Sequence, residues 1–236
     1  HDGILKIIFL NNKININYKN HKDKINFVTD KNNLDSNYKI KFNGNITLNP
    51  FYFNTRVSLS NINYDFLIDR VLPYLYIYNN SIHSNINGIF ELNLIDRNHK
   101  LLKDTDMKFI FVDKKILLEN ASINIKKIGV LNISKLEYLE KDNKIFVKSE
   151  MRMDIKDKRQ FFSRFQVPKK NRIEIKEIYF DLEKNLDEKK YYISNINIDS
   201  LNESVKNKIS FKYSDNEIYN MQTLTKLINE YLDEIN

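Results

Sequence analysis

Residues of alternating polarity recur along most of this chain, and this pattern limits the possible folds more than any other feature. In the stretch FNTRVSL at 53–59, Phe, Thr, Val and Leu alternate with the polar residues Asn, Arg and Ser. A period of two is that of a β-strand with one apolar face and one polar, solvent-facing side. Each dry face needs a partner, and the sequence offers little helix to supply one.

The alternating segments predict a mainly β protein with about ten to twelve strands. Asn, Asp and Lys clusters separate the segments and favour turns, because Gly and Pro number only 4 and 3. Pro50 is expected to break the segment 45–62, and Gly88 to mark a bulge or bend. The expected strands are 4–10, 13–19, 24–29, 38–43, 45–62, 81–96, 106–113, 116–126, 129–139, 144–156, 172–183, 190–199 and 207–213.

Helical spacing of apolar residues marks two segments, and one further helical turn is expected at 157–168. The first segment, about 64–71, is expected to end or kink at Pro73. The second, 216–235, is amphipathic over about five turns, with Asp215 or Asn216 as its cap. An isolated helix of this size is marginal in water. We therefore expect it to dock on one end of the sheet through Leu224, Leu227, Ile228 and Tyr231.

The order of these elements favours antiparallel strands, because parallel strands would need a helix between most neighbours. The 236 residues are interpreted as a single β-rich domain, 1–236. Strand-like sequence begins at once and no initiator Met precedes it, so we expect a C-terminal fragment of a longer chain. Two helices are too few to cover the dry faces. The sheet must close on itself, form a sandwich, or keep an apolar face for a ligand or partner.

Residues that carry chemistry are scattered. There is no cysteine, and the four His show no metal-binding spacing. No Gly-rich phosphate loop or nucleophile motif is present. The run Asp104-Thr105-Asp106 is interpreted as a solvated loop, and Asp65 and Asp69 as part of a polar helix face. We therefore expect no enzymatic activity, no cofactor and no metal.

The charge of the chain does not by itself identify a partner. The formal net charge is +7 and the pI about 9.2, a balance compatible with nucleic acid or an anionic membrane. Acidic and basic residues are interspersed, and the residue types are those of AT-rich codons. Aromatic and basic residues mix in KFIFVDKK and RQFFSRF, but buried strand Phe explains them, so nucleic acid is an unfavoured partner. No stretch reaches the 18–20 apolar residues, roughly, of a membrane span.

Several segments together resemble the AsmA-like family of bacterial envelope proteins. The similarity lies in LNPF and VSLSNI, then VLPYL, INGIFELNL and, near the end, MQTLTKLINEYL. Its most specific parts are Pro50-Phe51 and Pro73-Tyr74-Leu75, and it covers 45–95 and 172–236. The resemblance implies a long curved antiparallel sheet with an apolar concave face. It also implies a periplasmic protein, anchored to the inner membrane through a segment absent from this chain.

The resemblance further implies transport of phospholipid between the inner and outer membranes, which the chain would reach through missing parts or partner proteins. The acyl chains would lie against the apolar groove. The alternative is a non-enzymatic β-sandwich that serves as a scaffold or adhesion module of the cell envelope. The residues expected to line the groove are Ile86, Phe90, Leu92, Leu94, Ile145, Val147, Met151, Met153 and Ile155.

Overall fold

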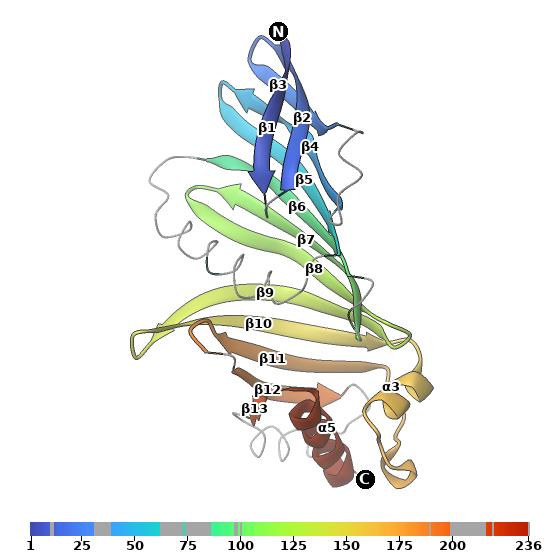
Figure 1. The fold of residues 1–236 in the computed structure, drawn as a ribbon. Coiled ribbons are helices and arrows are strands. Elements are labelled where there is room, and N and C mark those ends of the chain that lie inside the picture. The colour runs from blue at the N-terminus through green and yellow to red at the C-terminus, as the bar shows by residue number, and fades with distance from the viewer. Residues whose placement is uncertain are drawn as a thin grey trace. The chain divides into compact units, whose positions relative to one another are not determined.

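A computed structural model describes residues 1–9, 12–30, 39–61, 73, 86–96, 99, 101–188, 190–198, 216–218 and 220–235. The chain divides into two compact units, unit 1 at His1–Ile123 and unit 2 at Asn124–Asn236. Both are built mainly from strands, as the alternation predicts (Figure 1). The boundary between the units falls inside β8 (Lys115–Ile125).

Unit 1 is a run of strands that follow one another in chain order. Most neighbours are antiparallel and are joined by short turns, as predicted. Among the described residues the first strand of this unit does not pair with the last, so the sheet is open. The strands that precede β8 are β1 (Asp2–Phe9), β2 (Asn12–His21), β3 (Lys24–Thr29), β4 (Lys39–Leu48), β5 (Phe51–Ser60), β6 (Asn87–Ile95) and β7 (Leu102–Val112).

One pair departs from the expected antiparallel order, which makes the sheet mixed. β5 and β6 are parallel, with Val57 opposite Leu92. A parallel neighbour needs a crossover, and the 26 residues from 61 to 86 supply one. The helix predicted at 64–71 falls within this connection and lies outside the described residues. Asn49 and Pro50 form the turn between β4 and β5, so the segment 45–62 is broken at Pro50, as expected, into the end of β4 and the whole of β5.

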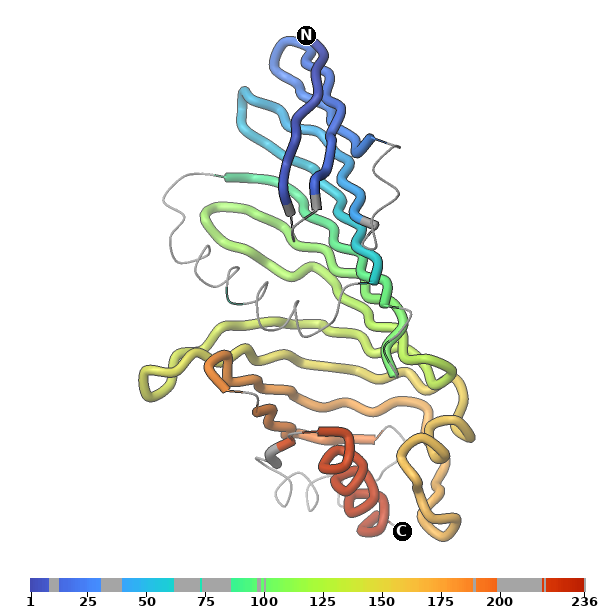
Figure 2. Tube along the Cα trace, in the orientation of Figure 1, coloured from blue at the N-terminus to red at the C-terminus, as the bar shows by residue number. Residues whose placement is uncertain are grey.

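Unit 2 contains the two longest described strands and the helices α3 and α5. β9 (Gly129–Lys141), β10 (Lys144–Ile155), β11 (Glu177–Asn185), β12 (Tyr191–Ile198) and β13 (Asn216–Ile218) follow one another in antiparallel order. The helices are α3 (Lys158–Arg164) and α5 (Met221–Ile235), with a short 3-10 turn, η3, at Lys169–Asn171. In Figure 1 and Figure 2, α5 lies beside β12, and α3 lies where β10 ends.

Two predicted boundaries in unit 2 are wrong. Strand β11 begins at Glu177 and not at 172, because its pairing with β10 starts there, opposite Asp154, and the 3-10 turn Lys169–Asn171 precedes it. The terminal helix begins at Met221 and not at 216. Residues Asn216–Ile218 pair with β12 as a short strand, since hydrogen bonding to that edge satisfies their backbone. The strand predicted at 207–213 lies outside the described residues.

Register gives unit 1 one apolar and one polar face, because directly opposed residues point to the same side of a sheet. We call the side that carries Phe53, Val57 and Leu59 the apolar face of unit 1. The side that carries Asn54, Arg56 and Ser58 is its polar face.

Three of the chain's four glycines lie on the apolar face of unit 1, each beside an aromatic ring of a neighbouring strand. A Cβ atom on Gly3 would lie 2.6 Å from Oη of Tyr18, and one on Gly44 would lie 3.0 Å from Cζ of Phe27. A Cβ on Gly88 would overlap the ring of Phe53. Gly88 is thus a regular member of β6 and not a bulge or bend. Its missing side chain leaves room for the ring of Phe53.

These contacts predict different costs for two similar substitutions in unit 1. In Gly44→Ala the new Cβ would overlap the backbone O of Asn54 and lie 2.9 Å from Cα of Thr55, and backbone atoms cannot rotate away. We expect a loss of about 1–3 kcal/mol in unfolding free energy. Gly3→Ala should cost clearly less, because only the Tyr18 side chain must move. Urea denaturation followed by circular dichroism measures both, and equal costs would contradict this account.

Candidate functional site

The apolar face of unit 1 is continuous across strands. One cross-strand row of opposed residues runs from β1 to β7: Gly3, Tyr18, Phe27, Gly44, Thr55, Phe90 and Phe109. Seven strands at a spacing of about 4.8 Å make this row roughly 29 Å long. Aromatic rings pack along it, with the centroids of Phe90 and Phe109 6.3 Å apart. The described elements of this unit are its strands, and Pro73, in the connection between β5 and β6, has helical backbone.

Exposure changes along this face. Val57 and Leu92 are 5% and 4% exposed, whereas Leu5 at the β1 edge is 53% exposed. Ile25 and Phe27 of β3 are half-buried. On the same face Ile14 and Ile16 of β2 are 3% and 6% exposed, whereas Leu48 and Phe51, where β4 meets β5, are 46% and 42% exposed. Exposed apolar surface on this face therefore lies at the β1 edge and at the β4–β5 turn, and the rest is mostly core.

The predicted groove residues of the segment 81–96 belong to this unit. Leu92 and Leu94 are 4% and 3% exposed, while Phe90 is half-buried. Opposition to Thr55 and Phe109 places Phe90 on the apolar face, and Leu92 and Leu94 follow at every second residue. Ile86 precedes β6 and is half-buried.

Unit 2 has an apolar face of its own, centred on β10. Met151 lies between Ile133 of β9 and Phe180 of β11, and Met153 lies between Leu131 and Ile178. We call this the apolar face of unit 2. Of the predicted residues, Val147, Met151 and Met153 are 5%, 8% and 7% exposed, and Ile145 and Ile155 are half-buried.

The same face contains two polar side chains that the sequence prediction did not explain. Ser149 lies between Val147 and Met151, and its hydroxyl donates to the backbone O of Leu182 at 3.2 Å. Lys184, opposite Val147, is 5% exposed, and its Nζ donates to the backbone O of Asn185 and of Glu188, each at 3.1 Å. Because both groups bond to nearby backbone, the face can stay dry around them.

Tyr138 also belongs to the apolar face of unit 2, since it lies opposite Val147. Burial raises the pKa of its phenol well above the usual value of 10.0, because the phenolate would lose hydration. It stays neutral at any physiological pH and adds an amphipathic ring to this face.

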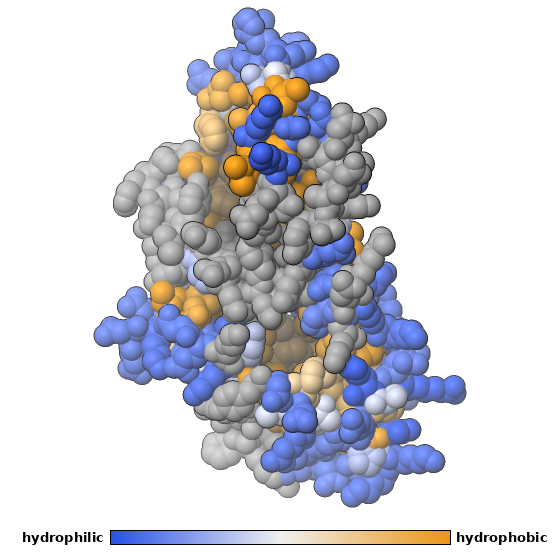
Figure 3. Space-filling model, viewed as in Figure 1, coloured by the Kyte–Doolittle hydropathy of each residue, from blue (hydrophilic) through white to orange (hydrophobic). Residues whose placement is uncertain are grey.

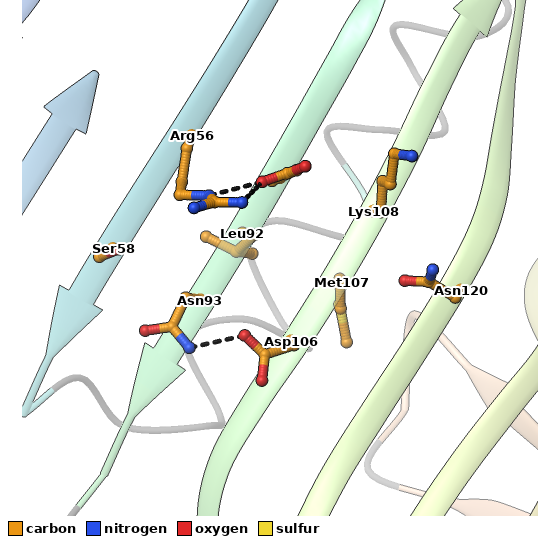
Figure 4. Close-up of a pocket in the computed structure, with 9 residues that line it drawn as sticks. Arg56, Ser58, Leu92, Asn93, Asp106, Met107, Lys108 and Asn120 are labelled. Atoms are coloured by element: carbon orange, nitrogen blue, oxygen red, sulfur yellow. Dashed lines mark hydrogen bonds and ion pairs between the residues drawn. The ribbon is translucent and has the colours of Figure 1, made fainter. Parts of the chain in front are cut away.

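The polar face of unit 1 is held by pairs of charged and amide side chains. Arg56 bonds to Glu91, and Asn93 donates to Asp106 at 2.7 Å (Figure 4). These residues surround an open hollow of about 460 Å³. Asp106 belongs to strand β7, so Asp104–Asp106 is not the solvated loop expected from the sequence.

The polar face of unit 2 has the same character, with Lys148 and Asp181 3.1 Å apart and Lys141 and Glu183 3.0 Å apart. Exposed pairs of this kind contribute at most about 1 kcal/mol each. In the described part of the chain, no group of three or more His, Asp or Glu could hold a metal ion. The same part contains no helix with the length and apolarity to cross a bilayer.

The terminal helix packs inside unit 2. Asn220 caps it, since its side-chain oxygen accepts from the backbone N of Gln222 at 2.9 Å and of Thr223 at 3.0 Å. Leu227 and Tyr231 are 6% and 3% exposed, and the Tyr231 hydroxyl donates to the backbone O of Ile196 on β12 at 3.0 Å. Leu224 and Ile228 are half-buried.

A cluster around α3 receives this helix, and the sequence prediction missed it. Phe161, Phe162 and Phe165 are 0%, 7% and 3% exposed, and the amide of Asn229 donates to the backbone O of Phe165 at 2.8 Å. The rings of RQFFSRF are thus core residues, as are Phe109 and Phe111 of KFIFVDKK. Most of the ring surface of both motifs is therefore buried. The sequence did contain a signal for this cluster: residues 161, 162 and 165 are spaced so that their rings share one face of a helix.

Comparisons with protein-family models, with curated proteins and with solved structures found no match.

The docked helix predicts a large effect of a buried charge. Leu227→Asp should lower the unfolding free energy of unit 2 by several kcal/mol, because the carboxylate would lose water without gaining a partner. Gln222→Asp, at an exposed position of the same helix, should change it by less than about 0.5 kcal/mol. Thermal unfolding followed by circular dichroism measures both. An unchanged melting temperature in Leu227→Asp would contradict docking.

Asp233 predicts how acid acts on this helix. Its carboxylate accepts from Nζ of Lys170 at 3.2 Å and from Nδ2 of Asn171 at 2.9 Å, and these bonds lower its pKa below the ordinary 3.8. A lowered pKa stabilises the folded state above that ordinary value, and this stability is lost as pH falls through the folded-state pKa. Unfolding free energy should therefore drop less below pH 3.8 in Asp233→Asn than in the parent chain. Parallel pH profiles would contradict the assignment.

Proposed function

We propose that this protein binds phospholipids through the apolar faces of its sheet and passes them between the inner and outer membranes of a bacterial envelope. The observation that supports this most directly is the continuous apolar row of unit 1, which crosses seven strands and lies beside the exposed Leu5 at the β1 edge. The resemblance to AsmA-like proteins agrees with it. The protein would work in the periplasm, anchored through a segment outside this chain.

The energetics of such a face suit acyl chains. Each buried CH₂ contributes about 0.8 kcal/mol, so a lipid tail gains affinity in proportion to its length on the face. Aliphatic contacts are non-directional, and a chain can slide along them without breaking hydrogen bonds. Met151 and Met153 have flexible thioether side chains that adapt to irregular ligands. Lys and Arg at the rims would meet headgroup phosphates.

This mechanism needs no cofactor and no reaction step. On both polar faces several charged side chains form ion pairs, such as Arg56 with Glu91 and Lys148 with Asp181, which is the arrangement of a solvated surface and not of an acid–base pair. We propose a binding protein and not an enzyme. The scaffold or adhesion alternative is favoured by one observation, the burial of Val147, Met151 and Met153. A sandwich would need two sheets packed face to face, however. In each unit the strands are successive neighbours within one sheet.

Site-specific photo-crosslinking in a Gram-negative host tests the proposal. A photoreactive residue is placed at Phe53 and at Met151 on the apolar faces, with matched controls at Asn54 and Arg152 one residue along. The two positions of each pair lie on the same strand, one on the apolar face and the other on the polar face. We expect phospholipid adducts, identified by mass spectrometry, at Phe53 and Met151 and none at the two controls.

The two units are tested separately by these pairs. Adducts at Phe53 alone would confine the lipid site to unit 1 and make the Met151 face an ordinary core. Equal labelling within both pairs, or no adducts at any position, would refute lipid binding and leave the scaffold alternative.

A further inference from the structure

The polar face of unit 1 changes character between its two ends. Toward β5–β8 its basic side chains are paired, Arg56 with Glu91 and Lys108 with Glu119. Toward β1 lysines outnumber carboxylates, and in the described part of the chain these lysines are not in ion pairs. Residues 1–30 and 40–48 of the described chain contain six lysines and three aspartates, a formal charge of +3.

The lysines at this end are exposed and share one face. Lys19 opposes Asp2 and Asn26, Lys13 opposes Ile8, and Lys41 opposes Ser58 of the polar face. Lys6 and Lys24 follow from the same alternation. In the described part of the chain, none of these five lysines forms an ion pair with a carboxylate. Their charge is therefore available to an external anion.

Large apolar side chains stand among these lysines on the same face. Ile4, Ile8 and Val28 are 58%, 74% and 52% exposed, and register places Ile4 and Val28 on either side of Asn17. Ile4 and Val28, with Asp2, Asn17 and Lys19, border an open hollow of about 560 Å³, and Ile8 lies outside it. Figure 3 shows hydrophobic and hydrophilic atoms intermixed over these N-terminal strands. Exposed apolar side chains gathered in one patch are typical of interaction surfaces.

We propose that this surface, formed by Ile4, Ile8, Val28 and the lysines around them, docks unit 1 onto an anionic phospholipid membrane. Aliphatic side chains within a basic rim are the combination that lies at a bilayer interface: the chains enter the headgroup boundary and the ammonium groups meet lipid phosphates. The membrane-facing side is the polar face, opposite the apolar row described above. The proposal therefore stands or falls apart from acyl-chain binding on that row.

Other occupants fit the surface less well. Nucleic acid would match the lysines, but single-stranded binding uses aromatic rings, and the exposed apolar residues here are aliphatic. A second copy of the chain would bring lysine against lysine and would be repelled. An anionic bilayer uses both features at once.

Vesicle co-sedimentation tests the docking with the whole chain. The probes are vesicles of phosphatidylcholine alone and vesicles in which about one third of the lipid is phosphatidylglycerol. We expect binding to the anionic vesicles that weakens with salt, and little to the neutral ones. Lys6→Gln/Lys13→Gln should weaken binding by about 25-fold, because each lysine near an anionic surface contributes about fivefold. Ile4→Ser/Ile8→Ser should weaken it by more than about tenfold.

The matched control is Lys114→Gln/Lys115→Gln, which removes the same charge from an exposed hairpin of the same unit. It should bind as the parent chain does, and circular dichroism verifies that all variants remain folded. Absence of vesicle binding, or equal losses in the control, would overturn the proposal. So would a stable dimer without vesicles. Oligonucleotide binding that depends on the lysines but not on Ile4 and Ile8 would also overturn it.

Discussion

The ladder of backbone hydrogen bonds between successive strands is the constraint on which the rest of this structure depends. It fixes register, and register decides which residues of neighbouring strands share a face. In unit 1 it places Val57 beside Leu92, and in unit 2 it places Met151 between Ile133 and Phe180. A slip of one residue would turn every such side chain to the other face. The apolar faces therefore exist only because the ladder is in this register.

Packing on these faces follows from the size of opposed side chains. Gly3, Gly44 and Gly88 stand where an aromatic ring of the next strand needs room, so rings and glycines complement each other across strands. In unit 2 the corresponding problem is polar. Ser149 and Lys184 stay on a dry face because nearby backbone carbonyls accept their hydrogens. Both solutions keep an apolar surface continuous where the sequence alone shows interruptions.

The two proposals use opposite sides of the same strands. A lipid tail on the apolar face needs non-directional contacts, whereas docking on a bilayer needs unpaired cations beside exposed aliphatic groups. The two ends of the polar face differ in charge pairing. Arg56 and Lys108 form ion pairs with carboxylates, whereas Lys6 and Lys13 form none in the described chain. A protein that delivers lipid would benefit from both surfaces, because lipid must leave a bilayer before it enters a groove.

Alternation by itself determined most of the strands, their one-sided faces and the amphipathic terminal helix, because a period of two or of 3.6 is a local property of the residues. It also identified Phe90, Leu92, Met151 and Met153 as sharing apolar faces. Only the tertiary structure decided the parallel pairing of β5 with β6, the pairing of Asn216–Ile218 with β12, and the contact of Phe165 with Asn229 of the terminal helix. Each depends on a partner distant in sequence. For the same reason, the exposure of Ile4 and Ile8 could not be foreseen: alternation shows that they share a face with Lys6, but not how much of that face other segments cover.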